Sequence, residues 1–147
     1  MELSHPRRTG IKLLSTLIAV AAVFAVIAFA FDYLMPDPCS NTLLSSTPSP
    51  DGHHKLVVFE RSCGASTGFS TQASLIDADG DLDKEGGNAL VADTDHGKAP
   101  SGPGGGPEVH VRWEGAGTVV LSVHPASQIF KSESRVDGVE IRLEKQP

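Results

Sequence analysis

The stretch that decides the fold is residues 47–66, TPSPDGHHKLVVFERSCGAS. Near its start stand Pro50, Asp51 and Gly52, a composition typical of a tight turn. Residues 54–61 follow, and their β-branched and aromatic side chains predict a strand. Cys63 comes next, in front of small residues. The stretch therefore predicts a turn and a strand that lead into either a structural disulfide or a reactive thiol.

The chain after residue 51 repeats this pattern of short apolar segments separated by Gly, Asp and Pro, without the 3.6-residue period of an amphipathic helix. Asp137 and Gly138 suit a type I′ turn, because both central residues of that turn need positive φ. Residues 115–117, Gly-Ala-Gly, favour another hairpin. These signals predict a mainly β fold, a small antiparallel sheet or sandwich of about six to seven strands. The predicted strands are 54–61, 69–76, 88–92, 108–114, 118–124, 129–136 and 139–144.

The predicted β region has about 95 residues, which is enough for one modest hydrophobic core. A disulfide would help to stabilise a domain of this size. The side chains expected to form the core are Val57, Phe59, Leu75, Val109, Val111, Trp113, Val120, Leu121, Ile129, Val139 and Ile141.

The N-terminal region has a different character. Residues 13–31 form a run of 19 without a charge, Pro or Gly. As a helix this run would be roughly 29 Å long, close to the hydrocarbon thickness of a bilayer. Arg7, Arg8 and Lys12 precede it, and this charge asymmetry predicts that the N-terminus stays in the cytoplasm. The sequence therefore predicts a transmembrane helix with the remainder of the chain exported.

Four regions follow from this pattern: a cytoplasmic N-terminus at 1–12, a transmembrane anchor at 13–34, a Pro- and Ser-rich tether at 35–50 and a β domain at 51–147. A cleaved signal peptide is the alternative to the anchor. The small residues around Phe29 would allow cleavage near Ala30, but the apolar run is longer than the 7–15 residues usual for a signal. The expected location is the bacterial inner membrane with the C-terminal domain outside the cytoplasm, or secretion after cleavage.

Charge narrows the partners that the exported part can have. Beyond residue 12 the chain has nine basic and seventeen acidic residues, and the basic ones are scattered singly. Binding to nucleic acid or to anionic lipid needs clustered Lys and Arg. We therefore expect no nucleic-acid partner, and the predicted partners are the membrane, through the anchor, and another protein of the envelope.

The two cysteines, Cys39 and Cys63, lie in a part of the chain expected in an oxidising compartment, where an even number favours a disulfide. Closing a loop of about 25 residues would stabilise the fold by roughly 3 kcal/mol in the chain-entropy model. One alternative leaves the two cysteines unpaired or in intermolecular bonds, and another makes Cys63 a nucleophile with a histidine as its base. The candidates for that base are His53, His54, His96, His110 and His124.

Several motifs together resemble a set of small bacterial envelope proteins. They are SPDG at 49–52, VVFERSCGAST at 57–67, FSTQ at 69–72, ADTDHG at 92–97 and PEVHVRW at 107–113. The family pattern runs SPDG, VVFxRxCGATT, FSTQ, ADxxHG and PEVxVRW, and it covers about two thirds of this chain. CGAST departs from the expected CGATT. The resemblance implies a domain type and a bacterial source, and it carries no activity.

An acidic loop separates two of the predicted strands, with alternating carboxylates at Asp77, Asp79, Asp81 and Asp83. Ca²⁺ prefers several oxygen ligands from one turning loop. An EF-hand, however, requires Gly at its sixth position and Glu at its twelfth, and this loop lacks both in either frame. The sequence predicts a solvated, flexible hairpin loop, with a weak Ca²⁺ site as the alternative.

Two further segments could carry chemistry. Asp93, Asp95 and His96 stand close enough in sequence to bind Zn²⁺ or to act in acid–base chemistry, but a turn in which Asp93 or Asp95 bonds nearby backbone amides explains these residues more simply. Residues 98–107, KAPSGPGGGP, are rich in Gly and Pro but lack the Gly-Lys-Ser/Thr ending of a phosphate loop. We expect an irregular loop there. The arginines of the strands are expected to be exposed, with a converging anion pocket as the alternative; they are Arg61, Arg112, Arg135 and Arg142.

The sequence therefore favours a membrane-tethered extracytoplasmic β domain that acts as a non-enzymatic interaction or envelope module, through a sheet edge or its acidic loops. It assigns no catalytic residue, metal ligand or cofactor. One alternative is a small metal-dependent or Cys/His hydrolase that uses Asp93, Asp95 and His96, with Cys63. Another is an immunity-like inhibitor of a cationic partner, which the acidic balance suggests.

Overall fold

The computed structural model describes residues 6–34, 39–64 and 68–146. The chain divides into two compact units, Met1–Asp37 and Pro38–Pro147, each described here by itself.

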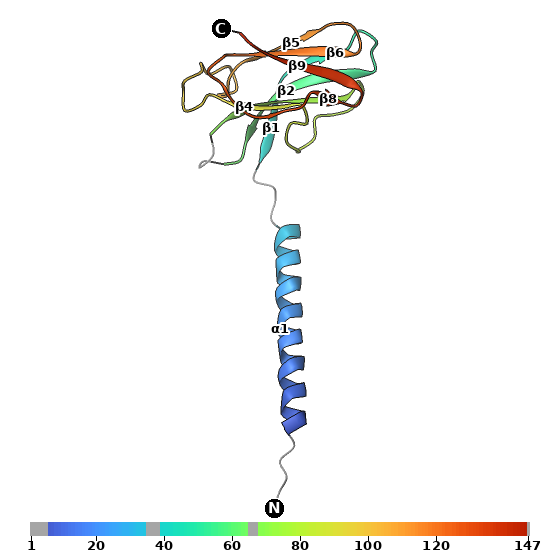
Figure 1. The fold of residues 1–147 in the computed structure, drawn as a ribbon, viewed down its shortest axis with the longest axis vertical. Helices are drawn as coiled ribbons and strands as arrows, with labels where there is room; N and C mark the ends of the chain where they lie inside the picture. The colour runs from blue at the N-terminus through green and yellow to red at the C-terminus, as the bar shows by residue number, and fades with distance from the viewer. Residues whose placement is uncertain (1–5, 35–38, 65–67, 147) are drawn as a thin grey trace, which may run out of the picture. The chain divides into compact units, whose positions relative to one another are not determined.

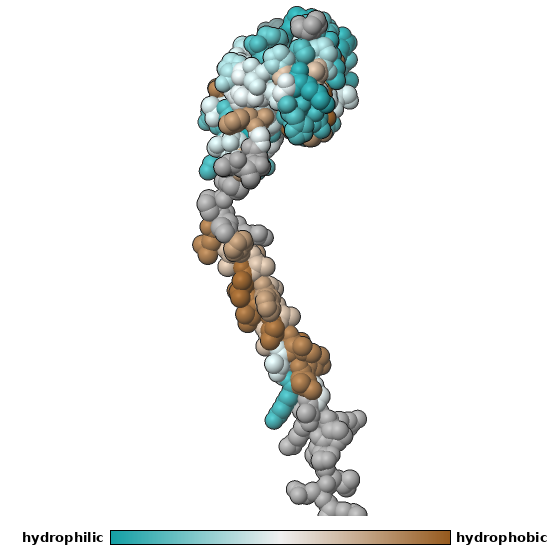
Figure 2. Space-filling view, turned by 90° about the vertical axis from the view of Figure 1, so that its left-hand side faces the viewer, coloured by the Kyte–Doolittle hydropathy of each residue, from teal (hydrophilic) through white to brown (hydrophobic). Residues whose placement is uncertain are grey.

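The N-terminal unit contains helix α1 (Pro6–Leu34), the brown segment of Figure 2. Its stretch Lys12–Phe31 has a mean hydropathy of 2.7, and none of it is buried against protein. Ser15 and Thr16 donate their hydroxyl groups to the Lys12 carbonyl, at 2.9 and 2.8 Å, so these polar groups are satisfied within the helix. By length and composition α1 is able to cross a membrane.

The C-terminal unit is a mainly β domain, as predicted, and its described residues form two sheets (Figure 1). The first sheet has the strand order β1-β2-β3-β4-β7 and the second has the order β5-β6-β9-β8. The strand count is higher than the six to seven expected. The strands are β1 (Ser40–Pro48), β2 (His54–Ser62), β3 (Ser70–Asp77), β4 (Leu90–Asp93), β5 (Val109–Trp113), β6 (Thr118–Val123), β7 (Gln128–Ser132), β8 (Arg135–Val136) and β9 (Val139–Lys145).

The turn before β2 has the features expected from Pro50, Asp51 and Gly52. Gly52 adopts φ of 72° and donates its N–H to the Ser49 carbonyl at 3.0 Å. The Asp51 carboxylate accepts hydrogen bonds from the Ser49 hydroxyl and the His53 N–H, at 2.6 and 3.2 Å. These two bonds stabilise the ionised form and lower the pKa of Asp51 below its ordinary value.

The last part of the chain crosses from the first sheet, which contains β7, to the second sheet, which contains β8 and β9. The single strand expected at 129–136 is two strands, because Glu133 donates its N–H to Ala89 beside the first sheet while Ser134 accepts from Ile141 of the second. The Asp137–Gly138 turn between β8 and β9 has φ of 46° and 83°, both positive as predicted. This crossing also brings β9 beside β6 in parallel, whereas the sequence predicted antiparallel pairing throughout.

The hydrophobic core lies between the two sheets. Leu56 and Val58 of β2 face it from the first sheet, and Val119 and Leu121 of β6 face it from the second. Further members are Ala73, Leu75, Ala89, Leu90, Val109, Val123, Val139 and Ile141. Three predicted core residues are buried outside this cluster, namely Val57, Phe59 and Val120. Strand alternation places them on the outer faces of the sheets, so those faces must be covered by other parts of the chain.

Residues 40–48, expected as part of the tether, instead form β1 and pair with β2 from Ser40↔Ser62 to Pro48↔Lys55. Most β1 side chains are exposed, so the sequence lacked the alternation of a half-buried strand. The main-chain bonds to β2 hold β1 in place, assisted by the Trp113 indole N–H, which donates to the Thr47 carbonyl at 3.1 Å. β1 thereby covers an edge of β2 that would otherwise offer unpaired backbone groups.

The outermost strands of the first sheet, β1 and β7, each carry a register shift. In β1 the shift leaves Leu44 without a partner residue in β2, and in β7 it leaves Phe130 without a partner residue in β4. Both are bulge-like irregularities, and a bulge locally bends and twists the strand that contains it.

A disulfide joins Cys39, directly before β1, to Cys63, directly after β2. We expect the double variant Cys39→Ser/Cys63→Ser to unfold with a free energy about 3 kcal/mol lower than that of the native protein, because a loop-closing constraint on the unfolded chain is lost. Urea denaturation followed by tryptophan fluorescence measures this difference. The native protein under full reduction should give the same value, and a loss below about 1 kcal/mol would contradict the prediction.

Candidate functional site

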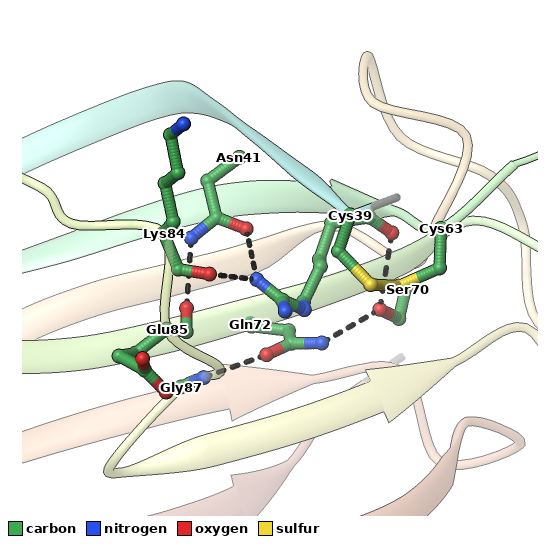
Figure 3. Close-up of a disulfide and its surroundings, with 9 residues drawn as sticks. Cys39, Asn41, Cys63, Ser70, Gln72, Lys84, Glu85 and Gly87 are labelled. Atoms are coloured by element: carbon green, nitrogen blue, oxygen red, sulfur yellow. Dashed lines mark hydrogen bonds between the residues drawn. A yellow bond between two sulfur atoms is a disulfide. The ribbon is translucent and has the colours of Figure 1, made fainter. Parts of the chain in front are cut away.

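Cys63, considered as a nucleophile, has no free thiol in this fold. Its sulfur is bonded to Cys39, and the described residues include no free cysteine. Figure 3 places the disulfide beside Ser70 at the start of β3, in the same end of the sheet as Asn41. The opening stretch of the sequence is therefore a turn, a strand and a structural disulfide.

The acidic loop between β3 and β4 is anchored to the first sheet, in contrast to the flexible loop expected (Figure 3). The Asn41 side-chain amide donates to the carbonyls of Asp83 and Glu85 at 2.9 and 2.8 Å. The Arg61 guanidinium donates to the Lys84 carbonyl, and Gly87 donates its N–H to the Gln72 side chain at 2.6 Å. These bonds fix the backbone of four loop residues, Asp83, Lys84, Glu85 and Gly87, and none of them involves an Asp carboxylate.

The anchored loop covers the outer face of the first sheet. Its contacts with Arg61 and Gln72 flank Phe59, which lies opposite Gln72 in the β2–β3 register. Phe59 is 0% exposed although alternation points it away from the core. The loop that looked like a Ca²⁺ site therefore acts as a lid over an apolar residue, and within the described residues no group of three or more His, Cys, Asp or Glu side chains could hold a metal ion.

The segment with Asp93, Asp95 and His96 forms a tight turn after β4. Asp95 and His96 adopt positive φ, 48° and 57°. The Asp93 carboxylate accepts the Asp95 N–H at 2.7 Å, and the Asp95 carboxylate pairs with Lys98 at 2.7 Å. Both carboxylates make bonds within the turn, so the prediction of a turn held by Asp side chains is confirmed.

The Gly- and Pro-rich loop expected as irregular is closely packed against the β2–β3 end. A Cβ on Gly106 would lie 2.5 Å from the Thr71 nitrogen, and one on Gly105 would lie 2.8 Å from the Phe69 ring. Gly104 contacts Leu44 and Glu60 in the same way. The glycines therefore serve close packing of backbone against side chains, and no phosphate-binding feature arises from them.

One concavity of the β domain lies at the ends of β5, β6 and β9 and has a volume of about 320 Å³. His110 and Ser122 face each other across the β5–β6 register, on the outer face of the second sheet. His124 follows β6 directly. The sequence analysis named both histidines as candidate bases for Cys63. In the fold they line one pocket, and Cys63 is not among its lining residues. The lining residues are Pro100, Glu108, His110, Ser122, Val123, His124 and Gln146.

Three polar side chains of this pocket have a near neighbour within the domain. Nδ1 of His124 accepts the Ala126 N–H at 3.2 Å, so the neutral ring carries its proton on Nε2. Nε2 of His110 lies 4.0 Å from a Glu108 carboxylate oxygen. The Gln146 side-chain amide donates to Glu144 at 2.8 Å. With one carboxylate and several neutral donors and acceptors in its lining, the pocket suits a small polar group that carries hydrogen-bond donors.

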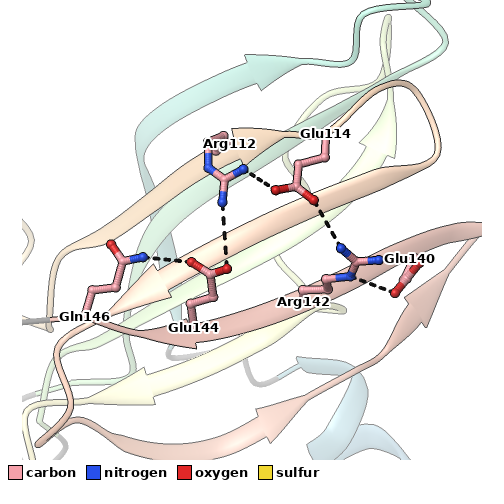
Figure 4. Close-up of polar contacts among 6 residues, drawn as sticks. All are labelled: Arg112, Glu114, Glu140, Arg142, Glu144 and Gln146. Atoms are coloured by element: carbon pink, nitrogen blue, oxygen red, sulfur yellow. Dashed lines mark hydrogen bonds and ion pairs between the residues drawn. The ribbon is translucent and has the colours of Figure 1, made fainter.

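Beside the pocket, a network of charged side chains covers the outer face of the second sheet (Figure 4). Arg112 pairs with Glu114 and, at 3.8 Å, with Glu144. Arg142 pairs with Glu114 at 3.1 Å and with Glu140 at 2.9 Å. Arg112, Arg135 and Arg142 are exposed as expected, whereas Arg61 is half-buried and bonded to Asn41 and the acidic loop. Arg112 and Arg142 are neutralised by glutamates and do not form an anion pocket.

The network protects an apolar side chain. Val120 lies between Arg112 and Arg142 in the two registers and is only 1% exposed on this outer face. The methylene stems of the flanking arginines cover it, with their charged ends in water. The hydrogen bond from Arg112 lowers the pKa of the Glu114 carboxyl, and Glu114 in turn raises the pKa of Arg112.

Sequence reasoning missed three polar members of the pocket, namely Glu108, Ser122 and Gln146. The alternation of β5 did indicate that His110 points outward, and a hairpin of β5 and β6 would have placed Ser122 near it. Gln146 was beyond prediction, because it reaches the pocket only through the parallel β6–β9 pairing.

Comparison of the chain with known protein families, with curated proteins and with solved structures found no match in any of the three. The function of the site is therefore argued from its geometry.

Packing of the acidic loop predicts that alanine destabilises the fold at Gly87 and has little effect at the adjacent Gly86. A Cβ on Gly87 would lie 2.6 Å from the Leu90 carbonyl oxygen and 2.9 Å from that of Ala73, whereas one on Gly86 would meet its nearest atom, of Gln72, at 3.5 Å. We expect Gly87→Ala to lower the free energy of unfolding by about 1–3 kcal/mol, since backbone atoms must shift. Gly86→Ala is the matched control and should change stability little. Chemical denaturation of both variants measures the difference, and equal effects would contradict the packing described.

The pKa shift of Glu114 predicts a pH dependence. Its folded pKa lies below the ordinary value of 4.5, so the stability that it contributes is present above that value and is lost as the pH falls through the folded pKa. We expect Glu114→Gln to be less stable than the native protein at pH 7, with a gap that narrows below pH 4. Thermal unfolding from pH 7 to pH 3 measures this gap. Added salt at 0.5 M should shrink it, since the pairs are exposed, and a gap independent of pH would contradict the assignment.

Proposed function

We propose that the chain is a single-pass protein of a bacterial inner membrane whose β domain lies outside the cytoplasm and acts as a non-enzymatic binding module. Helix α1 is long and apolar enough to act as the anchor. Basic residues precede the apolar run, which favours a cytoplasmic N-terminus. The Cys39–Cys63 disulfide suits an oxidising compartment on the other side. The family resemblance supports the bacterial source.

The observation that carries the proposal is the pocket of about 320 Å³ at the ends of β5, β6 and β9. It contains the carboxylate of Glu108 and the imidazoles of His110 and His124, and its lining includes no Lys or Arg from the described part of the chain. Residues 38–147 hold fifteen acidic and nine basic residues, a net charge of −6. Charge and hydrogen-bonding capacity together favour a basic side chain of a partner protein as the group that enters the pocket.

The same contacts support binding in preference to catalysis. The sulfur of Cys63 is in a disulfide, and the carboxylates of Asp93 and Asp95 are engaged in their own turn. Nδ1 of His124 is occupied by the Ala126 N–H. An inhibitor of a cationic partner is one form that the binding function could take.

Photocrosslinking in intact cells tests the binding site. A photoreactive amino acid at Ser122 lies in the pocket, whereas one at Thr118 lies on the same outward face of β6, four residues away, beside Glu140. We expect a discrete protein adduct from position 122 and at least a tenfold lower yield from position 118. Glu108→Gln or 0.5 M salt should weaken the adduct, because an ionic contact is screened or lost. Equal yields from both positions, or an adduct insensitive to salt, would overturn the pocket assignment.

The intact mass of the protein recovered from envelope fractions tests the anchor separately. We expect residues 1–30 to be retained and both cysteines to resist alkylation until they are reduced. A mature chain that starts at Phe31 would replace the anchored protein by a secreted one.

A further inference from the structure

The edge strands of the two sheets differ in how well they are protected against pairing with another chain. They are β1 and β7 in the first sheet and β5 and β8 in the second. β1 contains Pro48, which has no N–H to donate, and a register shift beside Leu44. β7 has a register shift beside Phe130, and β8 has only two residues. Proline, bulges and short length all keep an edge from recruiting a further strand, and β5 has none of the three over its described length.

The outer edge of β5 is a regular row of main-chain groups. Its residues pair with β6 without a register shift. The Glu114 N–H donates to the Thr118 carbonyl at 2.8 Å, so Glu114 and the alternate residues before it direct their main-chain groups toward β6. Val109, Val111 and Trp113 therefore direct theirs outward. Within the described part of the chain, no hydrogen bond reaches the main chain of these three residues from that side.

The pairing on the other side of β6 confirms this alternation. The Val123 carbonyl accepts the Gln146 N–H at 2.8 Å, and the Gly117 carbonyl accepts the Glu140 N–H at 2.9 Å. The odd-numbered residues of β6 thus face β9, and the even-numbered ones face β5. The open edge of β5 follows from two independent sets of hydrogen bonds.

The inward-facing side chains along this edge are apolar and only partly covered. Val109 is buried, but Val111 and Trp113 pack against the core and remain half-buried. The Trp113 indole is held in place because its N–H donates to the Thr47 carbonyl of β1 at 3.1 Å. A strand added beside β5 would cover more of Val111 and Trp113, so apolar burial would add to the main-chain bonds.

The edge continues directly into the pocket of the second sheet. Glu108 and His110 line that pocket and belong to β5 and the residue before it. The main-chain groups of His110 face β6, so a residue of an added strand opposite His110 would form a non-hydrogen-bonded pair, with Cβ atoms about 4.5–5.5 Å apart. A basic side chain at that position reaches the Glu108 carboxylate, which is 63% exposed and lies 4.0 Å from the His110 ring.

We propose that β5 recruits an extended segment of a partner protein as an additional antiparallel strand. The segment has apolar residues on its inner face, against Val111 and Trp113, and basic residues on its outer face, one of which enters the pocket. A net charge of −6 on the β domain favours a basic segment and opposes a second copy of this chain. This inference rests on the proposed function, because it names the segment that carries the basic side chain.

The probe for this proposal is the synthetic peptide Lys-Val-Lys-Val-Lys-Val-Lys with a fluorescein label, titrated by fluorescence anisotropy against the full chain in neutral detergent. In an antiparallel strand on β5, residues with inward side chains direct their N–H groups toward β5, so these are the valines. We expect N-methylation of the valines to lower the affinity about tenfold or more. The matched control is the peptide N-methylated at the lysines, whose N–H groups face solvent, and its affinity should change little.

The outcomes separate the added strand from the pocket. Equal affinities of the two methylated peptides would overturn the added strand, and so would a lack of binding by the unmodified peptide at about 1 mM. Glu108→Gln tests the pocket in the same titration and should weaken binding. If Glu108→Gln weakens binding while methylation has no effect, the proposed function stands and the added strand fails. If methylation weakens binding while Glu108→Gln has no effect, the strand stands and the pocket assignment fails.

A variant of β5 tests the same edge from the side of the protein. Val111→Pro removes an outward-facing N–H and no bond to β6, whereas the matched control Val111→Ala shortens the side chain and keeps the N–H. We expect the proline to lower the affinity about tenfold and the alanine to have a much smaller effect. Equal effects of the two would contradict main-chain pairing.

Resistance of Cys39 and Cys63 to alkylation without reduction shows that each variant folds. If Val111→Pro does not fold, the methylated peptides decide the question on the native protein. Light scattering of the full chain without peptide measures self-association. A dimer that Val111→Pro abolishes would overturn the partner segment and assign the edge to a second copy.

Discussion

The fold depends on the burial of β2 on both of its faces. Leu56 and Val58 face the core between the sheets, while Val57 and Phe59 face the other way and are equally buried. A strand of this kind needs a cover on each side, and in a domain of this size only one side can be another sheet. The acidic loop supplies the second cover through its backbone bonds, and β1 closes the edge.

This requirement explains why segments with polar sequences have structural tasks. The acidic loop is held by hydrogen bonds to its backbone, so its carboxylates are not needed to hold it in place. The Gly-rich loop is held by close packing that leaves no room for side chains. On the second sheet the charged network does the same for Val120, because arginine stems cover it and glutamates neutralise the arginines. Side-chain polarity alone is therefore a poor guide to function in this chain.

The mainly β class, the turn at Asp137 and the strand of the opening stretch could be predicted, because they depend on local composition and φ. Strand β1 could not be predicted, since it is stabilised by main-chain pairing with β2 and by the disulfide that joins Cys39 to Cys63, and neither leaves a pattern in its own residues. The division of residues 129–136 between two sheets depends on hydrogen bonds to β4 and β9 that no local pattern records. The pocket could be predicted only in part. Alternation along β5 turns His110 outward, but Gln146 lies in the pocket because β9 pairs with β6 in parallel, which no local pattern indicates.

The register shifts at the two outer strands of the first sheet have a consequence for crowding. Copies of a protein that is confined to a membrane meet at high local density, because they move in two dimensions, and straight strand edges of such copies would pair into mixed sheets. Leu44 in β1 and Phe130 in β7 interrupt the regular spacing of backbone donors and acceptors on these edges. If α1 anchors the chain in a membrane, an irregularity in each outer strand would work against polymerisation of neighbouring copies.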